Sequence, residues 1–127
     1  MYFKRKPLYW VGDSLEVLSG FSRRVRRHLG HALDYAQRGE RHPAARPLKG
    51  FGHAGVLEAI ANDAAGTYRV VYAVHMAGAV WVLHCFQKKS HRGREVARQD
   101  VDLIEARLKV ARALFRETHN GKTHHEQ

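Results

Sequence analysis

Two apolar segments separated by a short break are the feature that most constrains the fold of this chain. Residues 67–74 and 79–86 are rich in β-branched and aromatic side chains, which favour an extended backbone. The break around Gly78 is short enough for a turn. The sequence therefore predicts a long β-hairpin, preceded by a third strand over residues 55–61, so that three consecutive antiparallel strands form a meander.

The register of this hairpin decides which side chains share a face. The expected register places Arg69 opposite His84, and Val71 then lies opposite Val82 on the same side. The other side is expected to be apolar and to be covered by a helix. It would carry Tyr68, Val70, Tyr72, Val74, Trp81, Leu83 and Cys85.

Arg69 is the one charged side chain in its otherwise apolar strand. Burial of a charge without a partner is costly, so Arg69 must reach the surface of the sheet or be paired. One interpretation is an anion-binding site. The alternative is an ion pair with a carboxylate such as Glu58 or Asp63, and the spacing does not separate the two.

The first third of the chain predicts a strand and then helical structure. Residues 8–11 read as a short strand, and Asp13 followed three residues later by Glu16 has the spacing of a capping box. A helix is therefore expected to begin just after Asp13. Gly20 weakens it, and residues 21–36 then repeat apolar side chains at helical spacing. We expect a helical hairpin or one broken helix.

The second half adds a loop before the meander and a helix after it. Residues 40–55 are rich in Pro and Gly and are expected to form a loop that carries Lys49. A final helix capped by Gln99 or Asp100 should pack on the sheet. Its apolar stripe comprises Val101, Ile104, Leu108, Ala111 and Phe115. Residues 119–127 are polar and are expected to be a disordered tail.

The chain is strongly basic, with a formal net charge of +10 over 127 residues. The cations gather in the two ends while the apolar middle is nearly neutral, a distribution that favours a polyanion such as nucleic acid. We expect no signal peptide, no membrane span and hence a cytosolic protein. The single cysteine, Cys85, is expected to be a buried thiol. The ten histidines lack ligand spacing, so no metal or cofactor site is predicted.

Several short segments occur in an order that is typical of one family. They are Lys49-Gly50, residues 56–58, residues 68–72 and residues 86–90, followed by the opening of a helix at residues 100–108. In this order the chain resembles the RelE/ParE superfamily of small bacterial toxins, and within it the HigB-like, phage-derived branch. The resemblance implies one α+β toxin domain over residues 1–118. In it, a small antiparallel sheet with a mixed edge packs against an N-terminal helical hairpin and a C-terminal helix.

The resemblance also implies an activity and a set of residues. In the members of this superfamily that cleave messenger RNA on the ribosome, the active residues are scattered basic and aromatic side chains on this sheet, with no shared triad. By resemblance the expected catalytic residues are Arg69, Lys88 and Lys89, and His84 is added because of its position on the sheet. Glu58 would orient Arg69, and His84 would transfer a proton unless it is a sheet histidine with a satisfied hydrogen bond. Expected RNA-binding residues are Lys49, His91, Arg92, Arg23 and Arg27.

Alternatives remain open at this point. Superfamily members often place an arginine two positions after the glutamate of the second strand, and here Ile60 stands there. A non-enzymatic toxin that poisons DNA gyrase, as in the ParE branch, would use the same sheet as a scaffold. A basic nucleic-acid-binding module would explain the charge alone. For either kind of toxin the resemblance implies a cognate antitoxin, usually with a helix-turn-helix domain.

Overall fold

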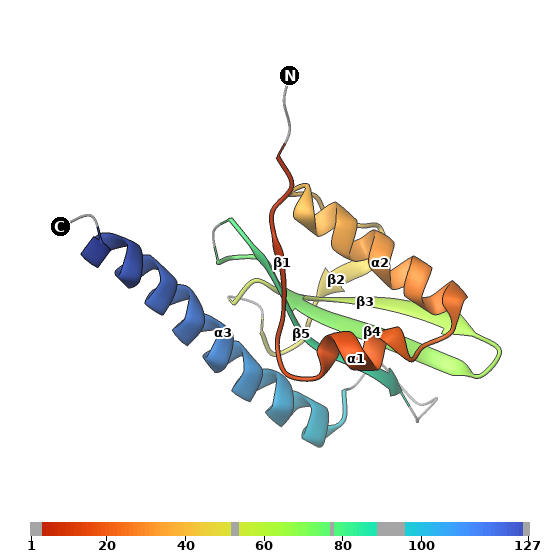
Figure 1. Ribbon diagram of the computed structural model, residues 1–127. Helices are drawn as coiled ribbons and strands as arrows, with labels where there is room; N and C mark the ends of the chain where they lie inside the picture. The colour runs from red at the N-terminus through yellow and green to blue at the C-terminus, as the bar shows by residue number, and fades with distance from the viewer. Residues whose placement is uncertain (1–3, 52–53, 77, 89–95, 126–127) are drawn as a thin grey trace.

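A computed structural model of the protein describes residues 4–51, 54–76, 78–88 and 96–125, and the side chains of the last segment up to residue 117. Its centre is a five-stranded sheet with the strand order β1-β5-β4-β3-β2 (Figure 1). The strands are β1 (Leu8–Trp10), β2 (Ala45–Pro47), β3 (Val56–Asp63), β4 (Gly66–Ala73) and β5 (Val80–Lys88). β3, β4 and β5 form the antiparallel meander that the sequence predicts, and β1 adds to β5 in parallel at one edge.

Helices cover both faces of the sheet. On one face lie α1 (Ser14–Ser19) and α2 (Arg23–Gln37), and on the other lies α3 (Arg98–His125) (Figure 1). The expected break near Gly20 is confirmed, because Gly20 ends α1 and Ser22 caps α2 by accepting a hydrogen bond from the Val25 amide at 3.3 Å. The predicted α+β fold is therefore confirmed.

Two local predictions near the N-terminus and before the meander are wrong. Asp13 does precede α1, but its side chain makes no cap hydrogen bond and is taken instead by an arginine of α3, so there is no capping box. The predicted loop over residues 40–55 contains β2, which pairs antiparallel with β3. This strand is only three residues long, and Pro47 is tolerated there because β2 lies at the edge of the sheet.

The predicted hairpin register is also wrong. Arg69 lies opposite Phe86 rather than His84, and Val71 lies opposite His84 rather than Val82. The pairing then shifts by one residue between Val71 and Tyr72, which leaves Leu83 as the extra residue of a β-bulge. A bulge of one residue changes which face the following side chains occupy, and the sequence pattern contains no sign of it.

The bulge explains how the apolar residues divide between the two faces. Tyr68, Val70, Tyr72 and Cys85 pack in the cluster under α1 and α2, as predicted. Trp81 and Leu83 were expected beside them but belong to the opposite cluster, under α3. The expected stripe of α3 is confirmed, because Ile104, Leu108 and Ala111 are buried and Val101 and Phe115 pack against the same cluster.

Two further expectations concern the ends and the surroundings of the domain. We expect the toxin domain to end at residue 118, whereas α3 continues to His125. The boundary at residue 118 stays a prediction. Within the described part of the chain, no helix is long and apolar enough to cross a membrane.

Ile104→Ala tests how α3 is held. Ile104 is fully buried between α3 and the sheet, so its truncation should lower the free energy of unfolding by about 2–5 kcal/mol through lost burial and a cavity. Leu103→Ala, the neighbouring residue at 36% exposure, is the matched control and should cost less than about 1 kcal/mol. Denaturant titration of both variants makes the comparison, and equal losses would contradict the assigned packing of α3.

Candidate active site

Three of the residues that the sequence predicts for the site lie on one face of the sheet, the face that α3 covers. Val71 and Phe86 belong to the cluster under α3, and side chains alternate between faces along a strand. Arg69, two residues before Val71, and Lys88, two residues after Phe86, therefore project from this face. Glu58 is the cross-strand partner of Val71 and shares it.

A buried ion pair joins two of these residues. Nη1 of Arg69 donates to Oε1 of Glu58 at 2.7 Å, and the two side chains are only 3% and 4% exposed. The ion pair that we considered as an alternative for Arg69 is therefore confirmed. The pair fixes the guanidinium plane on the sheet, because a buried carboxylate and a buried arginine each lose much of their stabilisation if the other moves.

A second arginine, which the sequence analysis missed, completes this cluster. Arg46 of β2 lies opposite Glu58, and its Nη2 donates to the same Oε1 atom at 3.2 Å. Its side chain is about one third exposed, so it links the buried pair to solvent. Ile60, which stands where the superfamily often has an arginine, lies opposite Arg69. Arg46 therefore supplies a second cation to a sheet that lacks the expected one.

An open pocket of about 470 Å³ lies beside the ion pair. Its walls contain Arg46, Lys49 and Glu58 together with Val96, which precedes α3, and Val101 in the first turn of α3. Lys49 is exposed, so the segment after β2 brings this predicted RNA-binding residue to the same pocket as Glu58. The arrangement can hold an anion between Arg46 and Lys49, with Glu58 setting the direction of the arginines.

His84 is also on this side of the sheet, but both of its ring nitrogens face α3. Nε2 lies 2.7 Å from Oδ1 of Asp100, and Nδ1 lies 3.5 Å from Nη1 of Arg107. A carboxylate only accepts and a guanidinium only donates, so this geometry selects the tautomer with the proton on Nε2. The ring also stacks on Phe86, with centroids 4.8 Å apart. The contacts favour the hydrogen-bonded sheet histidine that we weighed against a catalytic role.

Arg107 is the residue that ties α3 to the rest of the fold. Its Nη2 donates to Oδ1 of Asp13 at 2.6 Å, and its Nη1 donates to the carbonyl of Leu83, in the bulge, at 2.9 Å. Gly12, at φ 60°, makes room for it, because a Cβ there would lie 2.8 Å from the guanidinium. The hydrogen bond from Arg107 holds the pKa of Asp13 below its usual value, and desolvation opposes this only in part.

Other predicted site residues lie elsewhere. Arg23 and Arg27 are on the exposed side of α2, which packs on the opposite face of the sheet, so the structure does not bring them together with Arg69. Lys89, His91 and Arg92 lie outside the described residues. Among the described residues no group of histidine, cysteine and acidic side chains suits a metal ion. Burial raises the pKa of Cys85 to about 12, so it is a thiol at neutral pH.

Comparisons with known proteins agree with this architecture. A family model described as "Phage derived protein Gp49-like (DUF891)" matches residues 16–109. A solved structure of a mutant of the E. coli toxin RelE in the free state is similar with a TM-score of 0.53 and 18% identity, over 68% of this chain and 87% of that chain. Among curated protein sequences there is no match. The resemblance to the RelE/ParE superfamily is confirmed at the level of family and fold.

Glu58→Ala tests the buried ion pair. Removing the carboxylate takes away a partner of Arg69 in a buried position, so the free energy of unfolding should fall by about 3–5 kcal/mol. The double variant Glu58→Leu with Arg69→Met removes both charges and should be more stable than Glu58→Ala. Chemical denaturation of the single and double variants gives the comparison. A double variant that is less stable by the sum of the losses in Glu58→Leu alone and in Arg69→Met alone would contradict a coupled pair.

Asp13→Asn tests the contact between α1 and α3 through its pH dependence. Because the pKa of Asp13 is lowered in the folded state, its contribution to stability is present above its unfolded pKa of roughly 4 and is lost as the pH falls through the lower folded value. The stability difference between wild type and Asp13→Asn should therefore be constant near neutral pH and shrink in acid. A difference that does not change with pH would contradict the charged contact with Arg107.

Proposed function

The chain belongs to the family of phage-derived Gp49-like proteins, and from this premise we propose that it is the toxin of a type II toxin–antitoxin system, acting in the cytosol. We further propose that it is a ribosome-dependent endoribonuclease that cleaves messenger RNA and so inhibits translation. The RelE-like fold and the strongly basic surface support this proposal. A cognate antitoxin, of the helix-turn-helix type, would keep the free toxin from arresting its own host.

The observation that carries the proposal is the cationic cluster on the sheet face beside the open pocket. Arg69 is held in one orientation by Glu58, and Arg46 and Lys49 line the adjoining pocket. Preorganised cations of this kind stabilise the charge that develops when a phosphate is attacked, because they need not reorganise during the reaction. The guanidinium of Arg69 is buried against Glu58, so it adds positive charge beside the pocket, and Lys88 adds a point charge at the end of β5.

The proposed cleavage uses the 2′-hydroxyl of the RNA itself as the nucleophile. A general base takes the proton of the 2′-hydroxyl as its oxygen bonds to the adjacent phosphorus, and a general acid protonates the 5′-oxygen of the next nucleotide as its bond to phosphorus breaks. The products are a 2′,3′-cyclic phosphate and a 5′-hydroxyl end. We assign Arg69, Lys88 and Lys89 to stabilisation of the phosphate charge, with Lys49, His91 and Arg92 binding RNA. His84 remains a candidate for proton transfer only if its contacts with Asp100 and Arg107 open.

One observation favours a second candidate function. Arg69 is almost fully buried and paired, which is the state expected of a scaffold residue in a sheet that needs no catalytic geometry. A toxin of the ParE type, which poisons DNA gyrase by binding to it, would retain this buried pair and the same fold. The two candidates differ in whether conservative changes at the sheet face abolish toxicity.

Lys88→Ala and Arg69→Lys test the nuclease directly. Arg69→Lys keeps the charge beside Glu58 but loses the fork, and Lys88→Ala removes a half-buried cation at the end of β5. Each should slow cleavage of a message during translation on the order of a hundredfold, as loss of one preorganised donor does. Primer extension in a purified translation system measures the cuts.

Arg112→Ala, an exposed cation of α3 outside the site, is the matched control and should cleave as wild type does. The melting temperatures of all three variants separate loss of chemistry from loss of fold. If the two site variants fold and still cleave at the wild-type rate, the assigned site is wrong. If the wild type makes no cuts in any translated message, the nuclease proposal fails and gyrase becomes the target to examine.

A further inference from the structure

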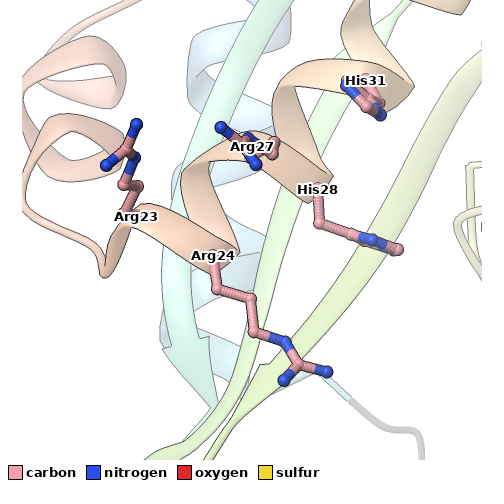
Figure 2. Close-up of a pocket in the computed structure, with 5 residues that line it drawn as sticks. All are labelled: Arg23, Arg24, Arg27, His28 and His31. Carbon is pink, nitrogen blue, oxygen red and sulfur yellow. The ribbon is translucent and has the colours of Figure 1, made fainter.

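Three arginines and two histidines form a shallow hollow on the outer side of α2 (Figure 2). The hollow measures about 600 Å³ and is lined by Arg23, Arg24, Arg27, His28 and His31. All five side chains are exposed, and Figure 2 shows that they project from consecutive turns of this one helix. We call this set the arginine face of α2. Arg26, also exposed, adds a fourth arginine to the same two turns.

The arginine face does not stabilise the helix that carries it. The partial positive charge at a helix N-terminus disfavours cations in the first turn, yet α2 begins with Arg23 and Arg24 and has no acidic residue there. Stabilising pairs on a helix join opposite charges three or four residues apart, and Arg23 is followed at that spacing by Arg26 and Arg27. These arginines therefore repel one another and lower the stability of α2.

The one acidic residue of α2 does not neutralise them. Asp34 is held by Arg5 at 3.0 Å and by Arg38 at 2.7 Å, at the far end of the helix. In the part of the chain that the structure describes, no salt bridge involves the arginine face. Its positive charge is open to a ligand from outside the protein.

The composition of the surface favours a phosphate backbone over a protein partner. Protein interfaces depend on aromatic and arginine anchors set in well-packed, desolvated pockets, and the arginines here have no exposed large apolar side chain beside them, since among the described residues these all lie on β1, α1 and α3. Arginine forks pair with phosphate oxygens, and binding of a nucleic-acid backbone needs many nearby cations without a deep apolar pocket. The arginine face has these properties.

The position of the arginine face separates its ligand from a strand bound in the candidate active site. α2 and the candidate active site lie on opposite faces of the sheet (Figure 1). A helix is about 10 Å in diameter and packed layers lie about 10 Å apart, so the two surfaces are separated by on the order of 20 Å of protein. A short strand that enters the active site would not also cover α2.

We propose that the arginine face of α2 binds the phosphate backbone of a folded RNA that is separate from the strand in the active site. The inference that the ligand is a phosphate backbone comes from the structure alone, and the choice of RNA over DNA rests on the proposed function. Binding here adds affinity and orientation, whereas cleavage depends on the sheet face. The two sites should therefore be separable by substitution.

The test compares two triple variants of the full chain that remove the same charge. R23Q/R24Q/R27Q removes the arginine face, and K109Q/R112Q/R116Q removes three exposed cations of α3. Binding of a 20-base-pair RNA hairpin is measured against salt concentration by fluorescence anisotropy, with a DNA hairpin of the same sequence and a short single-stranded RNA as further probes. Each lost phosphate contact lowers the slope of log K against log salt by about 0.9 for a duplex.

We expect the α2 variant to bind the RNA hairpin at least about tenfold more weakly at low salt, with a slope smaller by about 2–3, and to melt no lower than wild type. The α3 variant should lose much less affinity for the RNA hairpin. Equal losses in both would show that net charge alone drives binding and would overturn the proposal, as would unchanged binding by the α2 variant. Equal affinity for the DNA hairpin would overturn the choice of RNA.

Lys88→Ala separates this inference from the proposed function. It should bind the RNA hairpin as wild type does while it cleaves a translated message about a hundredfold more slowly. If the wild type cleaves no message but the α2 variant still loses hairpin binding selectively, the nuclease proposal fails and the RNA surface stands. If cleavage proceeds and hairpin binding does not depend on α2, the surface proposal fails and the nuclease stands.

Discussion

The buried ion pair between Arg69 and Glu58 is the interaction on which the rest of the site depends. Both charges lie inside the layer between the sheet and α3, where neither is stable without a close partner. The pair therefore requires β3 and β4 in their observed register, and it holds the Arg69 guanidinium at a fixed angle on the sheet. Arg46 adds a partly exposed cation to the same carboxylate, so the buried pair opens onto a cationic pocket rather than being sealed within the core.

The position of α3 completes this arrangement. Arg107 links α3 to the start of α1 and to the bulged strand, and His84 bridges Asp100 and Arg107 from the sheet. These polar contacts fix the direction of α3, while burial of its apolar stripe stabilises its packing on the sheet. The first turns of α3 then form one wall of the pocket beside Glu58. The sheet face that α3 covers is therefore basic and open at this pocket. On the opposite face of the sheet, α2 presents a second basic surface.

The sequence predicts the elements of this fold better than their mutual placement. The meander, α2 and the stripe of α3 follow from periodic apolar residues, and Arg69, Lys88 and Glu58 are recognisable because charges are rare in such strands. The bulge at Leu83 shifts the pairing by one residue and left no local signal. Arg46 was missed because a three-residue edge strand with a proline has no periodicity. Arg107 was missed because its partner Asp13 is 94 residues away in the chain.

The most direct measurement of the central claim, that this sheet face cleaves messenger RNA during translation, is a transcriptome-wide map of 5′-hydroxyl ends after expression of the protein in bacteria. If it does, new 5′-hydroxyl ends appear inside translated reading frames as growth stops, and they are about a hundredfold rarer when Lys88→Ala is expressed to the same level. Growth arrest without such ends, or the same ends with Lys88→Ala, would contradict the claim.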